Sequence, residues 1–314
     1  MPAALIDALD LVAAWAGCPV THTTIKGGLS HTVARVDTVD GRTWLLRVLD
    51  PRISEAGLGI PLHQEMVNTS RAAETGVGAK VLREMPGGLL LEYIHGRTLD
   101  ISDVRDPALT PAIAAACRRL HRGPRFGNDF SIFRKLDELL ALCRKHGLSL
   151  PAGYESRLPA VEEIEEALAV RAPAIVPCHN DLLPQNLMLE GRRVRIIDYQ
   201  LSGNNDPAFD LGDIAAEAEY DPDQVDHLTR AYLGDPRGSG RITFAARVRL
   251  NMILSNLAWT LWFVVHHGLL RPALVDFDYE AEAGGKFARA VLDLDGPDFG
   301  RLIDAVRGRH APPP

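Results

Sequence analysis

The sequence CHNDLLPQN at residues 178–186 is followed, one short hairpin later, by IIDY at residues 196–199. The first stretch comes after an apolar run, so Asp181 is expected on a loop at the end of a strand, and the second is a hydrophobic strand that ends in Asp198. The hairpin would return Asp198 to the side of Asp181 and Asn186. The alternative is that Asp181 only caps a turn and that Asp198 is a solvated strand end, but this reading leaves the complete pattern unexplained.

Two carboxylates and an amide gathered in this way are suited to phosphoryl transfer, which needs positioning and electrostatic stabilisation more than covalent chemistry from the protein. We predict that Asp181 is the catalytic base, because a carboxylate can accept the proton of an attacking hydroxyl. We predict that Asn186 and Asp198 are the metal ligands, because Mg²⁺ prefers carboxylate and carbonyl oxygens. The phosphate donor expected for this chemistry is ATP.

The chain divides into a strand-rich first part and a helical second part. The first part is expected to have helices at 4–16 and 61–74 and strands at 22–25, 31–39, 43–49, 80–83 and 89–93. Beyond it, apolar residues recur at helical spacing in 111–121, 131–146 and 157–170. We predict a nucleotide-binding lobe at residues 1–95 and a catalytic and substrate-binding lobe at residues 96–314.

The stretch 178–186 with Asp198 resembles the catalytic and metal-binding loops of the choline/ethanolamine kinase family, part of the aminoglycoside phosphotransferase and protein-kinase-like superfamily. SGNNDPAFDLGD at residues 202–213 resembles the segment that follows the metal-binding Asp in choline kinases, and the resemblance extends from about residue 26 to residue 287. It implies an α+β, bilobal protein-kinase-like fold, with a small antiparallel β-rich N-lobe and a larger, mostly helical C-lobe. It also implies ATP and Mg²⁺ as cofactors, and it implies that Asp210 braces the catalytic loop.

The turn KGGLS at residues 26–30 is a candidate phosphate-binding turn. Gly27, Gly28 and Ser30 are assigned to it, because glycine lets backbone N–H groups approach phosphate oxygens closely. Two adjacent glycines also fit a simple hairpin turn. Arg47 stands in the strand where protein kinases place a phosphate-pairing lysine, and choline kinases resemble this sequence in having Arg there. A guanidinium can bind phosphate oxygens at two points.

Three further residues complete the predicted nucleotide site. Glu65, in the next helix, is the candidate partner that orients Arg47, although a solvated helix face would also hold a Glu. Backbone groups of Glu92 and Ile94, at the end of the strand that leads into the hinge, are expected to pair with adenine. His31 departs from the Asn that the family often has after the glycine-rich turn.

The helix expected at residues 249–267 has an apolar stripe on one face and two tryptophans on the other. Because polar residues flank Trp259 and Trp262, we expect them to line a cleft rather than to fill a core. Aromatic faces recognise quaternary ammonium groups, which cannot donate an N–H hydrogen bond. The alternative is that both indoles pack against a neighbouring helix.

The aromatic pattern of this helix, continued at Phe277 and Tyr279, resembles the substrate pocket of choline kinases. The resemblance implies an acceptor site made of Asp181, Glu217, Tyr220, Trp259, Trp262 and Phe277. It favours a small cationic alcohol as substrate, above all choline. Gln200, Leu201 and Glu282 depart from the family pattern, so a related amino alcohol stays an alternative.

The composition is that of an ordinary globular protein. The 314 residues are 46% hydrophobic and 24% charged, and the net charge of −7 argues against nucleic acid as a partner. Four widely spaced cysteines are expected to be reduced. The most apolar stretch, residues 252–265, is too short and too interrupted to span a membrane, and the N-terminus lacks a basic leader, so the cytoplasm is expected. The sequence leaves the oligomeric state open.

Two other functions remain possible. One is a kinase for another cationic alcohol, such as ethanolamine, thiamine or an aminoglycoside. The other is a catalytically dead module that only binds a ligand, although the presence of Asp181, Asn186 and Asp198 argues against it. A protein kinase is disfavoured because no D-F-G and A-P-E pair bounds an activation loop.

Overall fold

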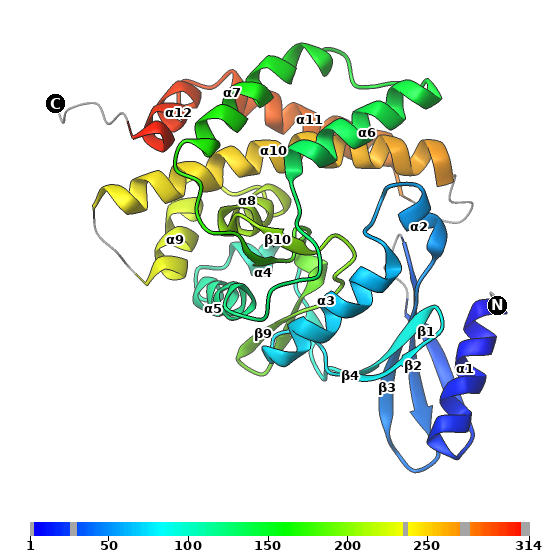
Figure 1. Ribbon diagram of the computed structural model, residues 1–314. Helices are drawn as coiled ribbons and strands as arrows, with labels where there is room; N and C mark the ends of the chain where they lie inside the picture. The colour runs from blue at the N-terminus through cyan, green and yellow to red at the C-terminus, as the bar shows by residue number, and fades with distance from the viewer. Residues whose placement is uncertain (1–2, 26–29, 235–237, 271–276, 309–314) are drawn as a thin grey trace.

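The structure is a computed structural model, and it describes residues 3–25, 30–234, 238–270 and 277–308. The four cysteines are free thiols, as expected. Figure 1 shows a strand-rich part beside a larger group of helices. The predicted α+β, protein-kinase-like arrangement is confirmed, and the division of the chain at residue 95 stays a prediction.

The strand-rich part is built on an antiparallel five-stranded sheet with the order β1-β2-β3-β5-β4. Its strands are β1 (Val20–Ile25), β2 (Thr32–Thr38), β3 (Thr43–Val48), β4 (Val81–Met85) and β5 (Gly88–Glu92). Helix α1 (Ala3–Ala16) covers one face, because its apolar residues recur every three or four positions and pack on alternate residues of β2 and β3. The same alternation places Arg47 on the opposite face of β3.

Two helices follow β3 and lie on the side of the sheet away from α1 (Figure 1). The short α2 (Pro51–Glu55), which the sequence pattern did not predict, begins where the Asp50 side chain accepts a hydrogen bond from Arg52 N–H. The longer α3 (Leu62–Glu74) agrees with the helix predicted at residues 61–74. It carries Glu65 into the interior, where this residue is 1% exposed. α3 thereby brings a buried carboxylate to the face of the sheet that holds Arg47.

The larger part is mostly helical. Its helices are α4 (Ile101–Arg105), α5 (Thr110–His121), α6 (Ile132–His146), α7 (Leu158–Ala169), α8 (Pro207–Glu217), α9 (Pro222–Leu233), α10 (Ser239–Leu270), α11 (Tyr279–Leu294) and α12 (Phe299–Arg307). Two small sheets lie among them: β6 (Arg97–Thr98) with β8 (Leu187–Glu190) and β9 (Arg193–Ile196), and β7 (Val176–Cys178) with β10 (Gly203–Asn205). These short strands carry the loops predicted to be catalytic.

Helix α10 is the central element of the larger part and packs against α6, α8, α9, α11 and α12 (Figure 1). It is 32 residues long, much longer than the helix expected at residues 249–267. By length and composition alone it could cross a membrane, but 78% of its most apolar window is buried inside the protein. Its apolar character is therefore explained by its place in the core.

Candidate active site

The catalytic loop leaves β7 and re-enters a strand at β8, and it gathers the three predicted catalytic residues. Asn186 Nδ2 donates to the backbone oxygen of Asp181 at 2.8 Å and lies 3.4 Å from Asp181 Oδ2. The β8–β9 hairpin pairs Leu187 with Ile196, and Ile197 N donates to Asn186 O at 3.0 Å. Asp198 is the next residue in the chain after Ile197, so the hairpin returns it to this loop. The predicted return of the chain at Asp198 to the loop that carries Asp181 and Asn186 is therefore confirmed, and the catalytic and metal-binding roles stay predictions.

Asp210, near the start of α8, holds the backbone of this loop in place. Its Oδ2 accepts from His179 N at 3.0 Å and its Oδ1 accepts from Asn180 N at 2.8 Å. Asn180 has a φ of 64°, a left-handed backbone conformation. It is stabilised by the two backbone amides that Asp210 accepts and by the hydrogen bonds of the Asn180 side chain to Leu201 and Asn205. The bracing role that the family resemblance implied for Asp210 is confirmed.

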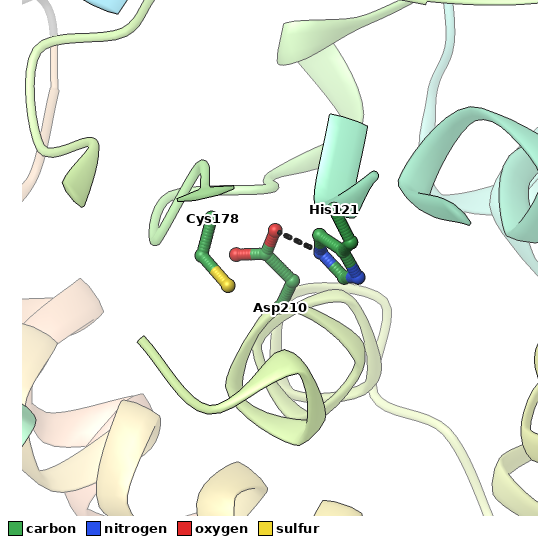
Figure 2. A group of neighbouring side chains, drawn as sticks. All are labelled: His121, Cys178 and Asp210. Carbon is green, nitrogen blue, oxygen red and sulfur yellow. Dashed lines mark hydrogen bonds and ion pairs between the residues drawn. The ribbon is translucent and has the colours of Figure 1, made fainter. Parts of the chain in front are cut away.

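Figure 2 shows Asp210 between His121 and Cys178. His121 Nε2 lies 2.9 Å from Asp210 Oδ2, and His121 Nδ1 lies 2.8 Å from the Tyr232 hydroxyl. Burial opposes ionisation of Asp210, but the contact with His121 and the loop amides lower its pKa below the usual value. Asp210 is therefore a buried carboxylate that stays charged.

The atoms of His121, Cys178 and Asp210 lie within 4.8 Å of one another, a spacing that a metal ion could bridge. Burial raises the pKa of the Cys178 thiol well above its usual value, so the thiol keeps its proton. Its Sγ lies 3.6 Å from Asn205 O, and both oxygens of Asp210 accept backbone amides. The donor atoms are thus engaged, and this group acts as a framework for the catalytic loop.

A second buried group joins β3, α3 and the end of β9. Arg47 Nε donates to Glu65 Oε1 at 3.1 Å, and Arg47 Nη2 contacts both Glu65 Oε1, at 3.0 Å, and Asp198 Oδ1. The predicted pairing of Arg47 with Glu65 is confirmed. Burial disfavours the charge on Asp198, but the Arg47 guanidinium more than offsets it, and the pKa of Asp198 is lowered. Its φ of 68° is a strained conformation at the end of the strand.

His31 belongs to this group, which the sequence did not indicate. Its Nδ1 accepts the Asp50 N–H at 2.9 Å, so Nε2 carries the proton, and Nε2 lies 3.3 Å from Glu65 Oε2. His31 is 9% exposed. The imidazole therefore lies against the Glu65 oxygen that Arg47 does not contact. Gly27 and Gly28 lie outside the described residues, and Ser30 directly precedes His31.

The hinge strand is placed as predicted. Glu92 N donates to Lys80 O at 2.9 Å, and Ile94 O accepts from Gly96 N at 3.0 Å. Because Glu92 N and Ile94 O are already engaged, the backbone groups predicted to contact adenine are the carbonyl of Glu92 and the amide of Ile94. Ile94 packs with a small apolar group between the sheet and the catalytic hairpin, which includes Leu45, Met188 and Ile197.

Asp213 is a site residue that sequence reasoning missed. It lies on α8, one turn after Phe209, and is fully buried. Its Oδ2 accepts from Leu182 N at 2.5 Å, directly after Asp181, and its Oδ1 accepts from Ser255 Oγ and Trp259 Nε1, both at 2.7 Å. The carboxylate thus ties the catalytic loop to α10. The only signal in the sequence was its spacing from Asp210 within the helix.

Carboxylates crowd around Asp181. Burial raises the pKa of Asp181 well above its usual value, and the charges of Asp213, Asp198 and Glu217 raise it further, while Lys286 opposes them. The same burial and the charge of Glu217 raise the pKa of Asp213 to about 7. Glu217 lies one helical turn after Asp213 on α8, and its Oε1 pairs with Lys286 Nζ at 2.6 Å; its place in the acceptor site stays a prediction.

The expectation that the tryptophans line a cleft is wrong for this structure. Trp259 and Trp262 are 4% and 8% exposed and belong to the larger core. The physical reason is that α10 is surrounded by helices, so its tryptophan face is covered as fully as its leucine face. Both indoles hydrogen-bond inward, Trp259 to Asp213 and Trp262 Nε1 to Leu58 O at 3.0 Å.

The aromatic residues fall into two separate groups. Trp262 stacks on His266 at 4.7 Å, His266 stacks on Tyr279 at 5.1 Å, and the Phe277 ring lies 4.8 Å from Tyr279. Trp262 and Phe277 are thus brought together. Tyr220 does not join them: it lies in the other core and its hydroxyl donates to Val104 O. Because α8 ends at Glu217, Tyr220 does not continue the helix face of Glu217 but packs in the other core, which corrects the expected grouping.

Together these features define a phosphotransferase with the protein-kinase-like fold. A model of the choline/ethanolamine kinase family matches residues 22–229. The chain belongs to the choline/ethanolamine kinase family, whose members are nucleotide-using kinases that act on an alcohol hydroxyl.

Relatives and solved structures agree with this assignment. The Haemophilus influenzae protein LicA is 28% identical over 256 residues, covering 77% of this chain and 73% of LicA. The crystal structure of a choline/ethanolamine kinase family protein from Mesorhizobium loti aligns with a TM-score of 0.81 and 29% identity, over 97% of this chain and 99% of that chain. A structure of LicA in complex with AMP shares the fold, with a TM-score of 0.72 and 19% identity over 98% and 99% of the two chains.

Proposed function

We propose that this kinase transfers the γ-phosphate of MgATP to the hydroxyl of choline or a closely related amino alcohol. The observation that carries the proposal is the convergence of Asp181, Asn186 and Asp198 at the end of the β8–β9 hairpin, with Arg47 in contact with Asp198. In-line phosphoryl transfer needs these groups within reach of one phosphate.

The residues at the metal position fit Mg²⁺. Asn186 uses its Nδ2 to hold Asp181, and Asp198 uses its Oδ1 for Arg47, so Asn186 Oδ1 and Asp198 Oδ2 have no hydrogen bond to any described residue. Both are hard oxygen donors of the kind that Mg²⁺ prefers. When bound there, Mg²⁺ would neutralise charge on the phosphate oxygens.

Asp181 is assigned as the base that receives the proton of the acceptor hydroxyl. Its raised pKa makes it a stronger base than a solvated carboxylate, and Asn186 keeps it beside the metal ligands. Arg47 is assigned to the phosphates, because its guanidinium is oriented by hydrogen bonding to Glu65, whose other oxygen lies against His31. The backbones of Glu92 and Ile94 are assigned to adenine.

A cationic acceptor fits the charges around Asp181. Asp213 and Glu217 lie on the same side of α8, and Phe277, which is only partly buried, provides an aromatic face that attracts a methylated ammonium. The names of relatives include both choline and ethanolamine kinases, and Gln200 and Glu282 depart from the choline kinase pattern. Choline is therefore the favoured substrate and ethanolamine the second candidate.

Steady-state kinetics with choline, ethanolamine, thiamine and kanamycin tests the proposal. We expect the highest kcat/KM with choline or ethanolamine, and a loss of phosphoryl transfer in Asp181→Asn with ATP affinity retained. A best substrate of another class would reject the substrate assignment. No turnover by the wild type with any of the four alcohols would favour a module that only binds its ligand.

A further inference from the structure

Lys286 is a buried cation beside the acceptor carboxylates, and none of the steps above uses it. It lies on α11, is 2% exposed, and its Nζ is 2.6 Å from Glu217 Oε1. A lysine is rarely buried this completely unless its charge meets a partner. The burial of Lys286 is therefore explained by its ion pair with Glu217, and the question is what this pair does beside the predicted acceptor site.

The position of this ion pair relative to Asp181 follows from a chain of contacts. Leu182 N, the amide after Asp181, donates to Asp213 at 2.5 Å. Asp213 and Glu217 are four positions apart on α8, so their side chains lie on the same face, one turn from each other. Glu217 then meets Lys286. The pair thus lies one helical turn from the carboxylate that holds the catalytic loop.

The two partners are not equally accessible. The Glu217 side chain is 15% exposed, whereas the Lys286 side chain is 2% exposed. Only Oε1 of Glu217 has a hydrogen-bond partner among the described residues, and that partner is Lys286. The lysine therefore lies behind the carboxylate, and Oε2 is the atom left for a ligand.

The charges around the acceptor position are unbalanced. Asp181, Asp213 and Glu217 supply three carboxyl groups to this region, and their mutual repulsion contributes to the raised pKa of Asp181 and of Asp213, whereas the Lys286 ammonium pairs directly with Glu217 alone. A cationic acceptor that approaches Glu217 must share that carboxylate with the resident ammonium. Two like charges on one carboxylate repel each other, and at short range in a partly buried site this repulsion is substantial.

We propose that Lys286 is a specificity-determining residue that fixes Glu217 through Oε1 and, as a resident counter-cation, limits how strongly the site prefers a charged acceptor to an uncharged one. The proposal rests on the proposed function. Removing the lysine charge would strengthen the attraction for a cationic acceptor without changing that for an uncharged alcohol of the same shape.

The test compares the better of choline and ethanolamine with its uncharged counterpart, 3,3-dimethylbutan-1-ol or propan-1-ol. The readout is the ratio of the two kcat/KM values, because a purely structural effect would lower both and leave the ratio unchanged. Glu217→Gln should lower the ratio, and Glu217→Gln with Lys286→Met should raise it again by roughly tenfold. The double variant removes both members of the ion pair, so no unpaired buried charge destabilises the fold.

Arg289→Met is the matched control, since Arg289 is a half-exposed cation on the same helix that pairs with Glu219. It should leave the ratio unchanged. A double variant with the same ratio as Glu217→Gln would overturn the proposal while the proposed function stands. A wild type that phosphorylates neither amino alcohol would reject the proposed function, and this inference with it.

Discussion

The contact between α8 and α10 at Gly212 should govern both stability and activity. A Cβ at this position would lie 2.7 Å from Val248 O, 2.8 Å from Asn251 Cβ and 2.8 Å from Met252 N. Two of these atoms belong to the backbone of α10 and cannot rotate aside. Gly212→Ala must therefore push the two helices apart.

The size of the effect follows from two opposing contributions. Ala in place of Gly in a helix interior stabilises by about 1 kcal/mol. Overpacking against fixed atoms costs about 1–3 kcal/mol, and contacts this short place Gly212 at the upper end. We expect the free energy of unfolding of Gly212→Ala to fall by about 2 kcal/mol. A Cβ at Gly284, on α11, would meet no atom within 4 Å, so Gly284→Ala should stabilise.

Urea denaturation of the two variants measures this difference, and phosphoryl transfer measures its effect on the site. Because α8 also carries Asp210, Asp213 and Glu217, a shift of this helix should lower kcat by about tenfold to a hundredfold. Gly284→Ala should keep wild-type kcat. If Gly212→Ala proved as stable as Gly284→Ala, the close approach of the two helices would be incorrect.

Further predictions concern single side chains. Arg47→Lys should weaken binding of an ATP analogue about tenfold, because an ammonium cannot contact Glu65 and phosphate in the same two-point geometry; calorimetry measures this, and unchanged affinity would exclude Arg47 from the nucleotide site. The pKa of Asp213 is about 7 in the folded protein against 3.8 in the unfolded chain, so the folded state binds this proton more tightly. The free energy of unfolding should therefore fall as the pH rises from about 4 to above 7. Denaturation curves across that range should show a smaller fall in Asp213→Asn than in the wild type. Cys178→Ala should keep its phosphoryl-transfer activity, because Asp210 holds the catalytic loop through two backbone amides without the thiol. Loss of activity together with loss of a bound metal ion would point to a metal centre at His121, Cys178 and Asp210.

The centre of the site could be predicted because its parts are close in the sequence. Asp181, Asn186 and Asp198 are joined by one loop and one hairpin, so local pairing is enough to bring them together. Asp210 follows soon after, at the start of the next helix. Arg47 and Glu65 are farther apart in the sequence, but the strand and helix that carry them were both recognised from their patterns.

Other site residues gave little or no local signal, and that of Asp213 was limited to its spacing from Asp210. His31, Asp213 and Lys286 are single polar residues, and each acquires its role from a partner on a distant element. The tryptophans of α10 were misread for the same reason. Helical periodicity reports which residues share a face, but the number of helices packed around that face decides whether it is open.

The sequence by itself determined the class of enzyme and the local framework: the strands, the helices, and the loop and hairpin that carry Asp181, Asn186 and Asp198. These depend on turn residues and periodicity within a few dozen positions. Only the tertiary structure decided which carboxylates are buried, which are paired with Lys286 or Arg47, and that both tryptophans are enclosed. Burial and charge pairing depend on atoms that meet through packing of elements far apart in the chain, and a sequence pattern that spans a few dozen residues does not contain that information.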